Sequence, residues 1–224
     1  AFMDAIEKAY HALRPYEIHK GDSKKIYSKW MPELMKTAAT LKKTELGSAK
    51  RLVEMLRQCI DEFNKVEITE ARQKGIRKPR VAVLGEILMN YHPSANGHVE
   101  DYLMDNGMEV YLPGMMDFFR VDEVVRAEKI KRGFSANPIA DRIEGSVTSK
   151  LLAHAAETAK KVMQSFKLYE HHADCFELVN YIDGIIDPTY NTGEGWLIPA
   201  EILYNSKHGI NSFINVQPFA CLAN

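Results

Sequence analysis

Short apolar segments alternate with longer helical patterns in the last two thirds of the chain, and this alternation constrains the fold most. Residues 81–84 (VAVL) form a continuous apolar run with turn residues after it, which is typical of a strand buried on both faces. The segments MEVYLPG (108–114) and NSFINVQPF (211–219) predict a second and a third strand. Because helical patterns separate these strands, the sequence predicts an α/β fold with an open, mostly parallel sheet and Rossmann-like layers.

The first third of the chain has a different pattern, in which apolar residues recur every three or four positions. This spacing predicts helices throughout 1–75, with Pro15 ending the first, Asp22 or Ser23 capping the second and Ser48 capping the third. Cys59 lies on the apolar stripe of the third helix and is predicted to be a core residue. A basic, proline-containing linker follows. We therefore predict a helical subdomain or hinge at 1–78 and an α/β domain at 79–224, truncated at its C-terminal end.

Five further helices are expected between the predicted strands. The predicted ranges are 95–107, 114–133, 145–167, 174–187 and 193–209, the fourth running into a short apolar piece.

The composition is that of an ordinary globular protein, and it excludes several classes of function. The 224 residues are 46% hydrophobic, and 29 basic residues against 30 acidic ones give a net charge of -1. No global field therefore favours nucleic acid or an anionic membrane. No apolar run approaches the roughly 20 residues of a membrane span, and no secretory signal is visible, so we expect a cytoplasmic protein.

The three cysteines, Cys59, Cys175 and Cys221, are widely spaced and odd in number. This argues against a disulfide framework and suits a reducing compartment. Three thiols cannot make a four-thiolate site. Any zinc ion or iron–sulfur cluster would therefore need histidine or carboxylate ligands, or ligands from another segment or chain.

Ligands of open parallel sheets bind beyond the carboxyl ends of the strands, where three loops are expected to meet. After the first strand, Glu86 could orient or bind a substrate group, and Asn96 with the amides that follow could hold an anion. Alternatively, Gly85 is a turn glycine, Glu86 an exposed carboxylate and Asn96 an ordinary helix cap. No complete glycine fingerprint for a nucleotide is present.

The segment NTGEGW (191–196) is a glycine turn that leads into a helix, where free amides and the helix dipole favour a phosphate or carboxylate. The charge of Glu194 could itself satisfy that helix end. Alternatively, Glu194 could carry a proton or support a binding residue, and neither possibility is excluded at this point.

Two further features involve possible metal ligands. His171, His172 and Cys175 have spacing used in zinc sites, but no second His/Cys pair is nearby, so a surface helix start is the simpler interpretation. Cys221 lies past the end of the third strand, where its thiol could face the crevice, although a buried free cysteine is the commoner outcome.

Four stretches in the same order resemble a known family: RPYE followed by KGD, KPRVAVLGEI with SANGHVEDYLMDNGMEVYLPG, NTGEGWLIPAEI, and NVQPFACLAN. The chain resembles, over nearly its whole length, the C-terminal, dehydratase-subunit-like region of the large activase-related proteins of the 2-hydroxyacyl-CoA dehydratase system. Family members usually have a glycine where this chain has Ala220 and often a proline where it has Ala223. Family members usually continue with the residues HI and a glycine–lysine step, and this continuation is missing here.

This resemblance implies ATP-driven delivery of one low-potential electron, with ATP handled by a separate domain and an iron–sulfur cluster in the full-length parent. It makes Cys221 a candidate cluster ligand, and no metal is expected in the isolated fragment. It also implies a set of crevice or anion-binding residues: Gly85, Glu86, Asn96, Gly193, Glu194, Gly195 and Trp196.

Two hypotheses follow, and neither assigns a complete catalytic site to this chain. In the first, the chain is a fragment of an activator-like iron–sulfur electron-transfer protein whose partners are an ATPase domain and an acyl-CoA dehydratase. In the second, it is a non-redox module that binds a CoA-type anion or docks the partner ATPase or dehydratase. The helical first third is a candidate docking surface. Neither hypothesis involves nucleic acid or a membrane.

Overall fold

A computed structural model describes residues 1–40, 46–190 and 193–221, except the side chains of 46–49 and 140–148. The chain forms two compact units, each described here by itself. Unit 1 comprises Ala1–Pro79, Met104–Glu109 and His154–Glu170, and unit 2 comprises Arg80–Leu103, Val110–Ala153 and His171–Asn224.

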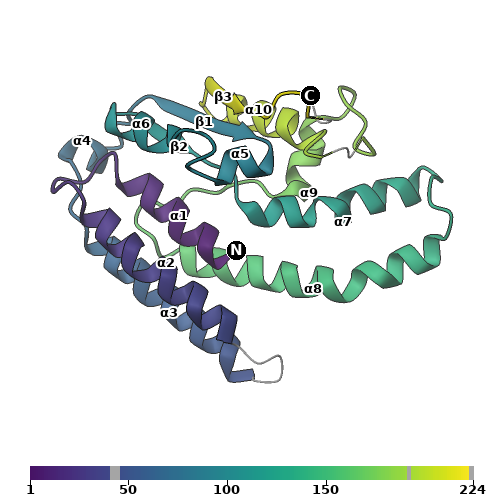
Figure 1. Ribbon diagram of the computed structural model, residues 1–224, viewed down its shortest axis with the longest axis horizontal. Helices are drawn as coiled ribbons and strands as arrows, with labels where there is room; N and C mark the ends of the chain where they lie inside the picture. The colour runs from purple at the N-terminus through teal and green to yellow at the C-terminus, as the bar shows by residue number, and fades with distance from the viewer. Residues whose placement is uncertain (41–45, 191–192, 222–224) are drawn as a thin grey trace. The chain divides into compact units, whose positions relative to one another are not determined.

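The helices predicted for the first third of the chain are confirmed and form the body of unit 1 (Figure 1). They are α1 (Phe2–Leu13), α2 (Asp22–Thr40), α3 (Leu46–Lys65) and the short α4 (Glu70–Gln73). Helices α1, α2 and α3 pack against one another along the apolar stripes seen in the sequence. Cys59 is fully buried on the inner face of α3, as predicted.

The starts of two of these helices differ from the prediction. Helix α2 already includes Asp22 and Ser23, and its first turn is held instead by the Glu17 carboxylate, which accepts hydrogen bonds from the amides of Gly21 (2.6 Å) and Ser23 (2.8 Å). The predicted cap Ser48 lies inside α3. A carboxylate brought in from outside the helix satisfies amides that a local cap would otherwise serve.

The sheet is an open, three-stranded and all-parallel sheet, which confirms the predicted α/β class. Its strands are β1 (Arg80–Gly85), β2 (Glu109–Tyr111) and β3 (Ser212–Val216), in the order β2–β1–β3. In the register of β1 and β3, Val81 lies opposite Ser212 and Gly85 opposite Val216. The central strand β1 is buried on both faces, as predicted, whereas β3 is partly exposed.

Of the remaining helices, two lie between β1 and β2 and the others lie between β2 and β3. They are α5 (Ile87–Tyr91), α6 (Val99–Asp105), α7 (Met115–Lys131), α8 (Pro138–Met163), α9 (Cys175–Leu178), the 3-10 turn η1 (Val179–Tyr181) and α10 (Leu197–Lys207). Helix α5 was not predicted, α8 begins earlier than expected, and the helix expected over 174–187 is limited to α9 and η1.

Helix α10 packs against the sheet in unit 2 (Figure 1). Ala82 and Leu84 of β1 form one apolar cluster with Ile198 of α10. A second core, between α7, α9 and α10, contains Trp196 and Cys175. The first core holds β1 against α10, and the second holds the start of α10 against α7 and α9.

Candidate functional site

The closest approach at the carboxyl edge of the sheet is between Gly85 and Val216, the last residues of β1 and β3. Gly85 has φ +151°, and a Cβ atom there would lie 2.0 Å from the main-chain oxygen of Val216. The next amide, that of Glu86, donates a 3.1 Å hydrogen bond to the same oxygen. Glycine is required here because only the absence of a side chain lets the two backbones approach this closely.

Two carboxylates serve the start of α5, directly after this contact. Glu86 caps the helix by accepting a 3.1 Å hydrogen bond from the amide of Met89. Glu194, although 107 residues away in sequence, accepts a 2.8 Å hydrogen bond from the amide of Ile87. Glu194 is buried, so this bond forms largely away from water. The structure thus brings together Gly85, Glu86 and Glu194 of the predicted residues.

The glycine turn also contains the other three predicted residues, Gly193, Gly195 and Trp196. Gly193 has φ +58° and Gly195 φ +25°, conformations in which glycine carries little strain. The side chain of Glu194 does not cap α10; its main-chain oxygen accepts from the amide of Leu197 at 2.7 Å. Trp196 is only 1% exposed and packs in the core, so its ring does not line the surface of a crevice.

Asn96 lies apart from these carboxylates and serves the start of α6. Its side-chain oxygen accepts a 3.3 Å hydrogen bond from the amide of Val99, and its amide group donates to Glu100 at 3.2 Å. Burial raises the pKa of Glu100, and the hydrogen bond from Asn96 opposes that effect. The side chain of Asn96 is therefore already engaged on both its oxygen and its nitrogen.

Cys221 follows β3 at the same edge of the sheet, after a tight turn. Its amide donates to the oxygen of Pro218 at 3.3 Å, and Ala220 in between has φ +62°. The residue is partly exposed, and the neighbouring Phe219 is fully exposed.

The other two cysteines, Cys59 and Cys175, are buried, and their burial makes the thiols less acidic. Burial raises the pKa of the Cys59 thiol to about 12, with the charge of Glu62 adding to the effect. Burial also raises the pKa of Cys175 strongly, with Asp117 next in importance. Burial therefore favours the protonated form of both thiols and shields both of them from a ligand outside the core.

The His-His-Cys segment does not converge on a point. His171 pairs with Glu177 at 2.7 Å, the ring of His172 stacks on Tyr111 with centroids 4.9 Å apart, and Cys175 points into the core. Asp174 caps α9 through the amides of Phe176 and Glu177, so the segment is a helix start, as predicted. Among the residues that the structure describes, no three His, Cys, Asp or Glu side chains are placed to hold a metal ion.

Unit 1 contains an ion-pair network that the sequence analysis missed. Arg77 pairs with both Glu109 and Glu170, and Tyr16 donates a 2.7 Å hydrogen bond to Glu109 while accepting one of 2.8 Å from the amide of Lys78. Burial works to lower the pKa of Arg77, but the hydrogen bonds to the two carboxylates outweigh it and raise that pKa. The network joins segments distant in sequence, so no local pattern could have revealed it.

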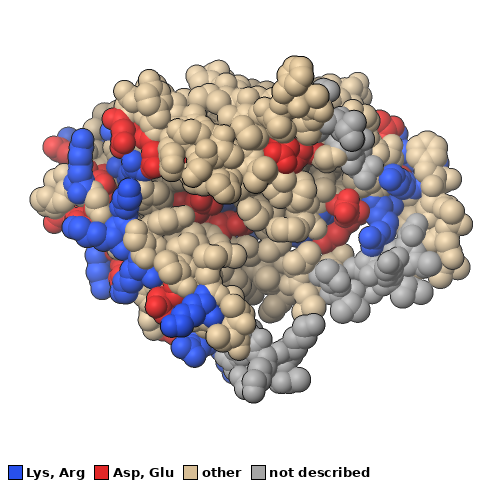
Figure 2. Space-filling view, in the orientation of Figure 1, with Lys and Arg blue, Asp and Glu red and all other residues tan. Residues whose placement is uncertain are grey.

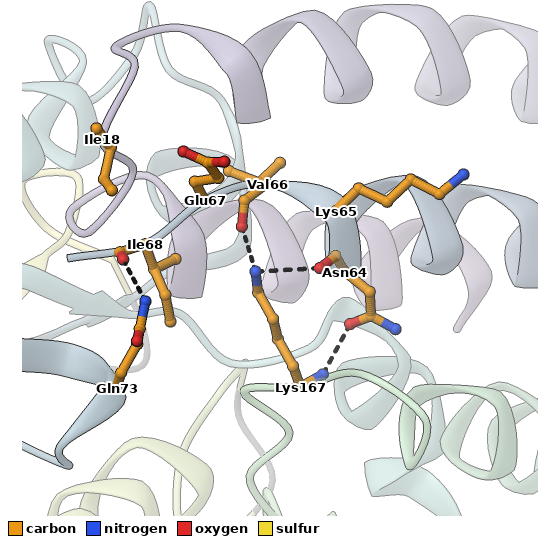
Figure 3. Close-up of a pocket in the computed structure, with 8 residues that line it drawn as sticks. All are labelled: Ile18, Asn64, Lys65, Val66, Glu67, Ile68, Gln73 and Lys167. Carbon is orange, nitrogen blue, oxygen red and sulfur yellow. Dashed lines mark hydrogen bonds between the residues drawn. The ribbon is translucent and has the colours of Figure 1, made fainter. Parts of the chain in front are cut away.

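Unit 1 also has an open pocket of about 450 Å³ (Figure 3). It is lined by Ile18, Asn64, Lys65, Val66, Glu67, Ile68, Gln73 and Lys167. The ammonium group of Lys167 donates to the main-chain oxygens of Asn64 (3.2 Å) and Val66, at the carboxyl end of α3. Desolvation lowers the pKa of Lys167. Because this cation satisfies the last carbonyls of a helix, its evident role is structural.

None of the helices in the described part of the chain is both long and apolar enough to cross a membrane. Comparison of the chain with family models, with curated proteins and with solved structures found no match in any of the three.

Proposed function

We propose that this chain is part of an activator-like iron–sulfur electron-transfer protein that supports the ATP-dependent, one-electron activation of 2-hydroxyacyl-CoA dehydratases. The observation that carries the proposal is the placement of Cys221: the thiol is partly exposed and follows β3 at the carboxyl edge of a parallel sheet. The proposed partners are an ATPase domain, on the same or a separate chain, and an acyl-CoA dehydratase. The proposed location is the cytoplasm.

The contrast between the three thiols supports this role for Cys221. An iron–sulfur ligand must lose its proton, and burial makes that loss unfavourable at Cys59 and Cys175. Cys221 is partly exposed and lies outside the apolar cores of unit 2. Of the three cysteines it is the one open to a ligand.

The backbone before this cysteine also supports the resemblance on which the proposal rests. Ala220 adopts φ +62°, a left-handed conformation that costs a residue with a side chain roughly 1 kcal/mol or more. Proteins of the resembled family usually have glycine at this position. The local backbone is thus one that the family's residue would adopt without strain.

Cys221 fits the role of one cluster ligand, and the described residues do not supply a complete ligand set. Cys221 supplies a single thiolate, whereas clusters take about four protein ligands. Within the described residues no other set of ligands converges, so the remaining ligands would come from another segment or another chain. When bound, the cluster would supply a low-potential electron. The protein's own part would be to hold Cys221 at the edge of a rigid sheet.

The anion-binding alternative receives less support from the geometry. The first amides of α5 are already hydrogen-bonded to the carboxylates of Glu86 and Glu194. A phosphate or carboxylate of CoA would have to displace Glu194, a buried anion, before it could bind there. We therefore do not extend the proposal to a CoA-binding site at this helix.

The proposal is tested by purifying the full-length parent protein under anaerobic conditions and measuring its iron content and visible absorption. The Cys221→Ser variant is expected to lose iron and the charge-transfer absorption of the cluster, because one thiolate is removed. Cys59→Ala is the matched control: it removes a buried thiol and should leave both signals unchanged. Equal iron and equal spectra in the natural protein and in Cys221→Ser would remove Cys221 from the ligand set.

A further inference from the structure

The charges of this chain are segregated along the sequence, although the net charge is close to zero. Residues 168–206 contain seven Asp and Glu residues and no Lys or Arg. Residues 20–36 contain five lysines against one Asp and one Glu. The second segment lies in unit 1. In the first, Glu194 and Glu201 are buried and Glu170 belongs to unit 1, so the acids that reach the surface of unit 2 are those of 174–187.

The lysines of α2 form a basic face, defined here as Lys24, Lys25, Lys29 and Lys36. All four are exposed, and Lys25, Lys29 and Lys36 share the side of α2 opposite the residues it buries. Lys25 pairs with Asp22 at 2.9 Å and Lys29 with Glu62 at 2.5 Å. Lys24 and Lys36 have no ion-pair partner within the described residues. Figure 2 shows Lys and Arg gathered over the helices of unit 1.

The acidic surface is the segment 174–190, which we call the acidic loop. Asp174, Asp183 and Asp187 are exposed on it, together with the large apolar side chain of Ile185. Asp174 caps α9 and Asp187 pairs with Arg132, whereas Asp183 has no ion-pair partner among the residues described.

We propose that a second copy of this chain is the partner, and that the basic face of one copy docks on the acidic loop of the next. The two surfaces have opposite charge, and each carries an exposed apolar residue, Met35 on α2 and Ile185 on the loop. With a net charge of -1, copies do not repel one another at long range. The contact joins different surfaces of identical chains, so it is head-to-tail and builds a ring or an open chain of copies.

Electrostatic contacts of this kind depend on salt, and that dependence provides the first test. The mass of the protein is measured by sedimentation at about 0.01 M salt, where charges act over ~30 Å, and at about 1 M, where they act over ~3 Å. We expect assemblies larger than one chain at low salt and single chains at high salt. Single chains at both salt concentrations would overturn the proposal.

A charge-reversal pair provides the second test and identifies the surfaces. Lys36→Glu and Asp183→Lys should each weaken assembly at low salt, because each places a charge of the same sign as the opposing surface in the contact. An equal mixture of the two variants should assemble again, since the reversed charges then match. Lys150→Glu is the control: it makes the same change of charge at an exposed lysine outside the basic face and should assemble like the natural protein. Failure of the mixture to assemble, or loss of assembly in the control, would refute the assigned surfaces.

Discussion

Replacement of Gly85 by alanine is the sharpest perturbation of the proposed site. The added Cβ would lie 2.0 Å from the oxygen of Val216 and 2.8 Å from its carbonyl carbon, and both atoms belong to the backbone. A flexible side chain could move aside, but here the ends of β1 and β3 must separate. That separation also breaks the 3.1 Å hydrogen bond from the amide of Glu86 to the same oxygen.

The expected cost has two parts. The strained backbone at φ +151° contributes roughly 1–3 kcal/mol. Loss of the Glu86 hydrogen bond contributes about 1 kcal/mol more. We therefore expect Gly85→Ala to lower the free energy of unfolding by about 3 kcal/mol. Gly209→Ala is the matched control: Gly209 has φ +82° with open space around its Cβ position, so only the roughly 1–2 kcal/mol of left-handed strain applies.

Urea unfolding followed by tryptophan fluorescence measures both variants against the natural protein. The buried Trp196 reports on unit 2, which contains both glycines. A Gly85→Ala variant no less stable than Gly209→Ala would refute the close approach of β1 to β3 at the carboxyl edge of the sheet.

Two further predictions concern side chains that bind backbone or carboxylate groups. Glu194→Ala should lower the free energy of unfolding by about 1.5–3 kcal/mol, because the amide of Ile87 loses a charged acceptor. Glu194→Gln keeps an oxygen at this place and should lower it by less. Urea unfolding and hydrogen exchange at the Ile87 amide measure the effect of both variants. Burial raises the pKa of Tyr16, and so does its hydrogen bond to Glu109. The protonated hydroxyl therefore stabilises the folded protein fully below the pKa that tyrosine has in the unfolded chain, about 10. This stabilisation is lost as the pH rises through the higher pKa of the folded protein. Tyr16→Phe should cost about 1–2 kcal/mol at neutral pH by depriving Glu109 and the Lys78 amide of a partner, and should flatten the alkaline fall of the urea midpoint; an unchanged fall would contradict the assignment.

The strands and long helices could be predicted from the sequence because their signals are local. The continuous run of β1 indicated a central parallel strand, and the stripe of α3 placed Cys59 in the core. Helix α5 was missed because five residues are too few to show a helical period. Its stability comes from two carboxylates, of which only Glu86 is adjacent in sequence.

The parts of the site that could not be predicted depend on contacts between distant residues. The bond from Glu194 to Ile87 spans 107 residues, and the Arg77–Glu109 pair spans 32. A single sequence records that such residues are charged but not which partner each one meets. The sequence marked Glu194 as a candidate residue at the start of α10. Its side chain instead binds the amide of Ile87, at the start of α5.

The role of Cys221 is the central claim, and cysteine alkylation of the full-length parent protein tests it most directly. The anaerobically purified protein is treated with iodoacetamide before and after removal of iron by a chelator, and each cysteine is quantified by mass spectrometry. We predict that Cys221 is protected before chelation and becomes reactive after it, while Cys59 and Cys175 stay unmodified in both samples because they are buried with raised pKa values. Equal alkylation of Cys221 in both samples would contradict the claim that its thiolate binds the cluster.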